Sequence, residues 1–359
     1  MSTALQVPKT ERLERARARM DEERLDALVV LKAENRAYLT GFTGSAGIAV
    51  LARERAQLLV DFRYVDQAGA EAVGWSVLRT SNLMEGLGAL LTEAAAARVG
   101  LEADAVTVAQ WRTLETPGRE LVALEGVDRL RWRKDPAELD LIRRAVQIAD
   151  AAFTEILPQV RPGVREVELA AELEYRMRRA GAERAAFETI VASGPRSALP
   201  HGRASERPLR RGDFVTFDFG AVVGGYHSDC TRTLVLGPAS AEQRTVYALV
   251  RDALEAAEAG IRPGMTGRAA DALARAWIAA AGYGEAFGHG LGHGVGLAVH
   301  EGPTLSPREE AVLPPGAVVT IEPGVYRSGW GGVRIEDLVV LEDGGPRRLG
   351  SLPRELLEL

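Results

Sequence analysis

Residues 214–220, Phe-Val-Thr-Phe-Asp-Phe-Gly, alternate apolar with small or polar side chains, which is the period of a half-buried β-strand. Gly224-Gly225 then provides a turn, and residues 227–235 resume a strand. A regular hairpin whose turn is centred half a residue before Gly224 places Asp218 directly opposite Asp229. Opposed side chains have Cβ atoms about 4.5–5.5 Å apart, so these two carboxylates repel each other unless a cation lies between them.

A second hairpin repeats this arrangement further along the chain. A turn centred at Gly329 joins the predicted strand 318–322 to the predicted strand 333–340 and pairs Glu322 with Glu336. Two hairpins that each carry a facing carboxylate pair predict two halves of one site. A β-bulge in either hairpin would shift its register by one residue.

The histidines point to the same part of the chain, because all five lie between residues 201 and 300. His293 belongs to Gly288-His-Gly-Leu-Gly-His-Gly-Val-Gly296, where alternating glycines allow a close approach of the backbone. One imidazole and four carboxylates suit two divalent cations, and oxygen-rich ligation favours manganese, cobalt or iron over a structural zinc site. His227 lies two residues before Asp229 and is either part of this site or a structural histidine at a strand end.

The composition excludes several kinds of partner for this protein. The 359 residues include 44 Lys+Arg and 50 Asp+Glu, a net charge of −6, with no strongly basic block and no apolar run of bilayer length. We therefore expect no nucleic-acid partner and no membrane partner. Cys230 is the single cysteine, which is typical of a reducing compartment, so the sequence predicts a cytoplasmic protein.

The length and patterning predict two domains, residues 1–130 and residues 131–359. The first has an α/β pattern, with predicted strands near 28–31, 48–51 and 57–60, a loop over 35–47, and helical pieces over 68–80 and 83–98. The second begins at Pro136, with Asp135 as the cap of a long helix. Further helices are predicted near 164–180, 241–259 and 269–281, so this half is an α+β domain.

Ordered blocks of the second domain resemble the pita-bread metallopeptidases, the family of methionine aminopeptidase, aminopeptidase P, prolidase and the non-peptidase creatinase. The blocks are Ala198-Leu-Pro-His-Gly202, Thr216-Phe-Asp-Phe-Gly220, Ser228-Asp-Cys-Thr-Arg-Thr233, Gly288-His-Gly-Leu-Gly-His-Gly294, Val299-His-Glu301, Thr320-Ile-Glu-Pro-Gly-Val-Tyr326 and Gly332-Val-Arg-Ile-Glu-Asp337. The resemblance implies an α+β pita-bread catalytic domain preceded by a smaller, creatinase-like α/β N-terminal domain. It also implies that two divalent metal ions, foremost Mn²⁺ and otherwise Co²⁺, Fe²⁺ or Zn²⁺, bind the matching residues Asp218, Asp229, His293, Glu322 and Glu336.

The domain layout narrows the activity that the resemblance implies. Prolidase, aminopeptidase P and creatinase carry an N-terminal α/β domain, and residues 35–45 are similar to its characteristic loop. Creatinase lacks the full ligand set, which is intact here. The resemblance therefore implies a Xaa-Pro dipeptidase (prolidase) acting on proline-containing dipeptides, or an aminopeptidase P acting on longer peptides, and a homodimer in either case. A non-catalytic binding protein on the same fold is the alternative from a different class.

The resemblance also implies roles for individual residues. Glu322 is expected to pass a proton from a metal-activated water to the leaving proline nitrogen. His300 and His201 are expected to hold the substrate and to stabilise the tetrahedral intermediate through hydrogen bonds. His289 is similar to a residue that lines the proline pocket. Arg334 and Tyr326 resemble groups that orient the ligands, and we expect all three to contribute to substrate binding.

One position departs from the family pattern. Many prolidases and related aminopeptidases have an arginine shortly after the Val-His-Glu motif, where it can bind the substrate's C-terminal carboxylate, and this chain has Thr304 there. Arg36, Arg203 and Arg327 are the candidates for a replacement, and each is otherwise a solvated surface charge.

Overall fold

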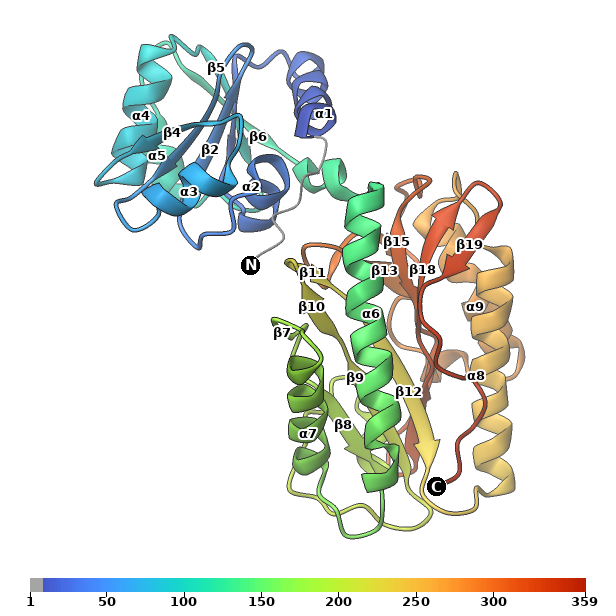
Figure 1. The fold of residues 1–359 in the computed structure, drawn as a ribbon. Helices are drawn as coiled ribbons and strands as arrows, with labels where there is room; N and C mark the ends of the chain where they lie inside the picture. Colours follow the sequence, from blue (N-terminus) through green and yellow to red (C-terminus); the bar gives the residue numbers. More distant parts are fainter. Residues whose placement is uncertain (1–8) are drawn as a thin grey trace. The chain divides into compact units, whose positions relative to one another are not determined.

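The chain folds as two units that divide at the peptide between Arg131 and Trp132. The structure is a computed structural model that describes residues 9–359 (Figure 1). Within that range, no helix combines the length and the apolar character needed to cross a membrane.

The N-terminal unit is built on one six-stranded mixed sheet in the order β4-β3-β2-β1-β5-β6. Its strands are β1 (Ala27–Val30), β2 (Ile48–Ala52), β3 (Ala56–Val60), β4 (Ser76–Arg79), β5 (Arg98–Glu102) and β6 (Glu120–Leu124). Its helices are α1 (Lys9–Glu22), α2 (Ala33–Thr40), α3 (Val65–Glu71), α4 (Leu83–Glu93), α5 (Val108–Leu114) and the 3₁₀ turn η1 (Val127–Arg131). The three predicted strands of this unit are confirmed, with β1 buried along its whole length.

Two local predictions in this unit are wrong. The predicted loop over 35–47 begins as helix α2, which ends at Gly41, a residue with φ of 79° that supplies the left-handed cap. The helix predicted over 68–80 stops at Glu71, and residues 76–79 form the edge strand β4 instead. β4 runs parallel to β3, and a short, largely accessible edge strand leaves little hydrophobic signal.

Helices of the second unit follow their sequence signals closely. α6 (Pro136–Ile156) begins with a capping box, in which Asp135 accepts a hydrogen bond from the Glu138 amide and Glu138 accepts one from the Asp135 amide. Ser240 forms the same kind of capping box with Gln243 at the start of α8 (Ala241–Gly260), whereas Thr266 accepts only the Ala269 amide at the start of α9 (Gly267–Ala280). The other elements are α7 (Glu166–Arg179) and the 3₁₀ turns η2 (Leu157–Gln159), η3 (Gly194–Ala198) and η4 (Gly284–Ala286).

Strands of the second unit form several small antiparallel sheets. They are ordered β12-β9-β8, β11-β10-β7, β14-β13-β15-β18-β19 and β16-β17. Their bounds are β7 (Arg184–Ala185), β8 (Ile190–Ser193), β9 (Phe214–Phe219), β10 (Ala221–Val223), β11 (Tyr226–His227), β12 (Cys230–Val235), β13 (Gly292–Gly294), β14 (Glu301–Leu305), β15 (Val318–Ile321), β16 (Gly324–Arg327), β17 (Gly331–Arg334), β18 (Asp337–Glu342) and β19 (Gly345–Arg348).

The register of the first hairpin corrects the prediction. Asp218 pairs with Thr231, two residues beyond the predicted partner Asp229. The reason is the turn: Gly224 and Gly225 have φ of 58° and 79°, so these two glycines form the tip, as in a type I′ hairpin, and the centre moves along by one residue. A shift of two residues preserves the side-chain alternation, so both aspartates keep the same face of the hairpin.

The register of the second hairpin is confirmed. Ile321 pairs with Asp337 on one side of the carboxylate pair, and Gly324 pairs with Arg334 on the other side. Glu322 and Glu336 lie between these two ladders. There the Glu322 amide donates to the carbonyl of Leu291 and the Glu336 amide to that of Thr231. The hairpin therefore opens at this point, with one glutamate directed towards each neighbouring strand.

Helices cover these strands from two sides (Figure 1). Helices α8 and α9 pack with β15, β17 and β18 in a core whose members, such as Val250, Ile278 and Val319, are fully buried. On the α6 side, the Phe153 ring stacks on Phe219 at 5.0 Å and meets Phe217 edge-on at 5.5 Å. The strand ends that carry the site are thus held by packed apolar side chains on both sides.

Candidate metal centre

Strand ends of the second unit bring the five ligand-type side chains together. Asp218 lies on β9, Asp229 directly precedes β12, and His293 is the middle residue of β13. Glu322 directly follows β15, and Glu336 directly precedes β18. All of them therefore project from the sheet framework, which holds side chains more rigidly than loops do.

The distances between these groups are short. Ligand atoms of Asp229, His293 and Glu336 all lie within 4.8 Å of one another, which makes them the one group of this kind found in residues 9–359. The Nε2 atom of His293 lies 3.7 Å from Asp229 Oδ2 and 3.3 Å from Glu322 Oε1. Asp218 interacts electrostatically with Glu322 and His293, and its Oδ2 accepts a hydrogen bond of 2.6 Å from Arg334 Nη2.

Two carboxylate oxygens in this cluster fit a bound cation. Asp218 Oδ1 and Glu336 Oε1 are buried and lack a hydrogen-bond partner within the described part of the chain. An ionised oxygen in that state is costly, and a coordinated cation removes the cost. His293 Nδ1 lies 3.1 Å from the carbonyl oxygen of Gly294, which can only accept, so the proton sits on Nδ1 and Nε2 faces the carboxylates.

Electrostatics of the cluster also favour a cation. Burial raises the pKa of Asp229 and of Glu336, and the neighbouring carboxylates raise both further. Burial alone lowers the pKa of His293, but the hydrogen bond and charge of Glu322 outweigh it and raise that pKa to about 9. Burial opposes ionisation of Glu322 as well, yet His293 lowers its pKa to about 2.

Two threonines that the sequence analysis did not assign support the ligands. Thr231 Oγ1 donates to Glu336 Oε2 at 2.6 Å. Thr320 Oγ1 donates to Glu322 Oε1 at 3.1 Å and accepts the amide of His293 at 3.0 Å. Thr320 lies two residues before the glutamate that it binds, a spacing visible in the sequence, whereas Thr231 binds a glutamate 105 residues away.

The predicted substrate-binding residues form a chain of contacts. Arg334 donates to Asp218 and, through Nη1, to the hydroxyl oxygen of Tyr326 at 2.9 Å. His289 Nε2 lies 2.9 Å from the same hydroxyl. Arg334 is buried and its Nε also donates to Thr231 at 3.0 Å, so it braces the ligands of both hairpins.

The remaining histidines divide between the rim and the framework. His300 is exposed, and its ring centroid lies 4.3 Å from that of His293. His201 is also exposed, and the preceding Pro200 accepts a hydrogen bond from Arg334 at 3.1 Å. His227 is buried, with Nδ1 3.1 Å from the Gly296 carbonyl oxygen, a contact typical of a structural role.

Glycines at alternate positions let β13 lie tightly between its neighbours. A Cβ atom on Gly292 would lie 2.1 Å from the Thr320 carbonyl oxygen, and one on Gly294 would lie 2.3 Å from the Gly302 carbonyl oxygen. Both distances are too short for any side chain. The glycines therefore set the separation between His293 and the carboxylates on the adjacent strand.

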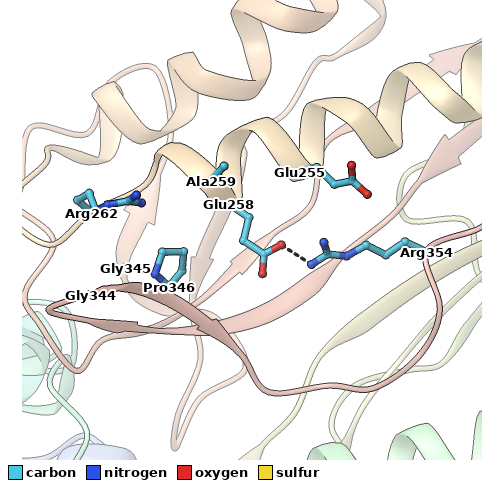
Figure 2. A pocket seen from close by; sticks show the side chains of 8 residues that line it. All are labelled: Glu255, Glu258, Ala259, Arg262, Gly344, Gly345, Pro346 and Arg354. Atoms are coloured by element: carbon cyan, nitrogen blue, oxygen red, sulfur yellow. Dashed lines mark hydrogen bonds and ion pairs between the residues drawn. The ribbon is translucent and has the colours of Figure 1, made fainter.

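A separate cavity of about 370 Å³ lies between α8 and the β18–β19 hairpin (Figure 2). Arg354 in its wall pairs with Glu258 and also with Asp337, at 2.5 Å from Oδ2. Asp337 directly follows Glu336, so this ion-pair network anchors the backbone next to a ligand-type residue. None of the five ligand-type residues lines this cavity.

Known families match both units. The model of metallopeptidase family M24 matches residues 140–343, and that of the creatinase/prolidase N-terminal domain matches residues 12–132. These matches confirm the predicted order of a creatinase-like α/β domain followed by a pita-bread domain.

Relatives match over nearly the whole chain. A Bacillus subtilis protein named uncharacterized peptidase YqhT is 42% identical over 97% of this chain and 100% of its own length. A structure titled Xaa-Pro dipeptidase from Bacillus anthracis superposes with a TM-score of 0.94, at 43% identity, over 98% of this chain and 100% of that one. A structure titled X-Pro aminopeptidase from Thermotoga maritima gives a TM-score of 0.88, at 39% identity, over 97% and 99%. The chain belongs to metallopeptidase family M24, and membership of this family implies divalent metal ions at this centre.

Proposed function

We propose that the chain is a Xaa-Pro dipeptidase that hydrolyses the peptide bond before proline. The observation that carries the proposal is the convergence of one imidazole and four carboxylates, two of whose buried oxygens have no hydrogen-bond donor among residues 9–359. The B. anthracis relative titled Xaa-Pro dipeptidase supports the choice of substrate. The residues proposed to hold two divalent ions, foremost Mn²⁺, are Asp218, Asp229, His293, Glu322 and Glu336.

Chemistry at the centre divides between the ions and the chain. Two divalent ions, when bound, would supply an activated water and polarise the substrate carbonyl. Glu322 is held in place by Thr320, and its carboxylate can accept a proton and deliver it to the leaving proline nitrogen. His300 and His201 stand at the rim, where imidazole N–H groups can donate to the substrate and to the developing oxyanion.

The proposed proline pocket lies beside His289. Its ring meets Phe287 edge-on, with centroids 5.1 Å apart, and lies tilted against Tyr326 at 5.5 Å. Arg275 fixes this segment from helix α9, donating to the carbonyl of His289 at 2.6 Å. Aromatic walls held in this way suit the flat, apolar ring of proline.

Thr304 and Arg36 are already engaged within the chain and are poorly placed to bind a dipeptide's carboxylate. Thr304 Oγ1 donates to Glu309 Oε2 at 2.7 Å, so its hydroxyl proton is already bound by a carboxylate of the chain. Arg36 is 3% exposed and binds the carbonyls of Gly44 and Gly47 within the N-terminal unit. These contacts favour a second candidate function, aminopeptidase P, which has no need of a clamp behind proline.

Two further arginines were candidates for the clamp, and both have acidic partners. Arg203 Nε lies 3.0 Å from Glu188, and Arg327 Nη1 lies 2.5 Å from Glu242. Both pairs are substantially exposed, so either arginine can exchange its partner for a substrate carboxylate at small cost. The homodimer and the cytoplasmic location stay predictions.

Hydrolysis of Ala-Pro beside Ala-Pro-Ala tests the proposal, with Mn²⁺ added after chelator treatment. Cleavage of the dipeptide alone supports Xaa-Pro dipeptidase, whereas equal or faster cleavage of the tripeptide supports aminopeptidase P. If neither peptide is cleaved, the proposed proline specificity is wrong. Arg203→Ala and Arg327→Ala, compared on both peptides, then show whether either arginine affects the dipeptide alone.

A further inference from the structure

A buried ion pair lies at the base of the segment that carries His300. Lys134 Nζ is 2.6 Å from Glu301 Oε1, and the two side chains are only 1% and 2% exposed. Lys134 comes from the start of the second unit, just ahead of α6, and Glu301 directly follows His300. The family blocks include Glu301, but neither the metal centre nor the proposed mechanism uses this pair.

The segment that carries His300 has no regular structure of its own. Residues 295–300 connect β13 to β14 outside any helix or strand. Glu301 holds this segment, because its Oε2 accepts the amide of Ala298 at 3.3 Å while its Oε1 binds Lys134. Gly296 packs against the same carboxylate, since a Cβ there would lie 2.4 Å from Oε1.

The partner of Glu301 is itself fixed to the framework. The Lys134 amide donates to the Gly316 carbonyl at 2.9 Å, and Nζ lies 3.3 Å from the Trp132 carbonyl oxygen. Trp132 also lies against Gly302, where a Cβ would come within 2.4 Å of its ring. The Lys134 ammonium group is therefore fixed in position, and it orients the carboxylate of Glu301, the residue that follows His300.

We propose that the Lys134–Glu301 ion pair positions His300 over the metal centre. A buried ion pair adds little stability over an apolar pair of similar size, because desolvation offsets the attraction. The pair instead fixes an orientation. Because the Glu301 carboxylate binds both Lys134 and the Ala298 amide, it holds residues 295–300 in one arrangement. That arrangement sets the 4.3 Å separation between the His300 and His293 rings. The role given to His300 rests on the proposed function, whereas the fixing of residues 295–300 does not.

A double variant separates positioning from stability. Lys134→Met removes the cation beside the buried Glu301 carboxylate, and adding Glu301→Gln removes the negative charge as well, so the double variant should regain most of the lost melting temperature. Positioning predicts that its kcat stays about 10- to 100-fold below wild type, as for loss of a group that orients an active residue, while KM and bound metal change little. Wild-type kcat in a double variant with restored stability overturns the proposal.

Hydrogen exchange provides a readout that needs no substrate. Amides of residues 295–300 should exchange faster in the double variant than in wild type, relative to the amides of α7. Wild-type exchange in this segment contradicts positioning even if the chain cleaves neither test peptide. Glu301→Gln alone, which keeps the side-chain shape, serves as the second variant if Lys134→Met does not fold.

The matched control is another ion pair of the second unit, Arg207–Asp213, whose atoms lie 2.6 Å apart. Arg207→Met with Asp213→Asn removes it in the same manner. This control should change stability and leave both kcat and the exchange of residues 295–300 as in wild type.

Discussion

Each unit of the molecule buries a glutamate in its sheet framework, and the two carboxylates differ in how fully they are hydrogen-bonded. Glu102 in the N-terminal unit is fully buried and accepts hydrogen bonds from the amides of Leu31 and Lys32 and from Asn35 Nδ2, at 2.6, 2.7 and 2.6 Å. Glu336 in the second unit is 2% exposed, and its Oε1 has no donor in the described chain. Burial raises the pKa of both carboxyl groups.

The contrast shows how a buried carboxylate reveals its purpose. Both carboxylate oxygens of Glu102 accept hydrogen bonds within its own unit, so it acts as a structural link between β5 and the start of α2. Glu336 receives one bond from Thr231 and leaves the other oxygen open, which lowers stability unless something outside the chain completes it. The same side chain is thus structural in one unit and a proposed ligand in the other.

Glu336→Gln should have the largest effect. An amide keeps the shape but loses the charge that a divalent ion requires, so we expect hydrolysis of the preferred peptide to fall by more than about 100-fold, the upper end for loss of a supporting group. Metal analysis should show less than the wild-type metal content, while circular dichroism stays unchanged. Asp218→Asn should behave alike, and wild-type turnover in either variant would remove that residue from the ligand set.

Metal addition should come next in size. An ion that binds only the folded chain raises the free energy of unfolding by about 2.7 kcal/mol per site at 100 times its dissociation constant. The melting temperature of chelator-treated protein should therefore rise on adding Mn²⁺, and rise less in Glu336→Gln. Equal melting curves with and without Mn²⁺ would argue against a metal centre.

Thr231→Val should weaken metal binding without removing a ligand. It deletes the hydroxyl that orients Glu336 and keeps the side-chain volume, so metal affinity should fall by about 10- to 100-fold. Thr216→Val is the matched control, because its hydroxyl contacts Thr233 and none of the carboxylates. Titration of activity against Mn²⁺ measures both, and identical curves for the two variants would deny Thr231 its orienting role.

Glu102→Gln should have the smallest effect and the opposite profile. An amide nitrogen cannot accept, so at least one of the three donors loses its partner, at a cost of about 1 to 2 kcal/mol in unfolding free energy. Urea unfolding measures this loss, and turnover per folded molecule should remain that of wild type. A fall in turnover with unchanged stability would erase the distinction between the two glutamates.

Sequence patterns predicted the second unit better than the first, for physical reasons. Alternation over 214–220, the cap at Asp135 and the turn at Gly329 are local signals, and the structure follows each of them. The register at Gly224 was missed because two adjacent glycines allow more than one turn centre, and only the φ angles decide between them. Helix α2 was missed because its start depends on Glu102, about 70 residues away in sequence.

The candidate site was predictable as a set of residues but not as an arrangement. Motif blocks pointed to the ligand-type residues, whereas the bracing by Thr231, Thr320 and Arg334 depends on which strands become neighbours. The ion pair between Lys134 and Glu301 joins positions 167 residues apart and leaves no periodic trace in the sequence. Such pairings arise only when the fold brings distant segments together.

The glycines of β13 have a consequence for how this sequence can change over generations. Gly292 and Gly294 each face a backbone oxygen of a neighbouring strand, so no change at the facing residue can make room for a side chain. Compensatory mutation, which lets most packed positions drift in pairs, is closed to them. Any codon change that replaces either glycine should therefore displace β13, so we expect glycine at both positions wherever this strand arrangement is kept.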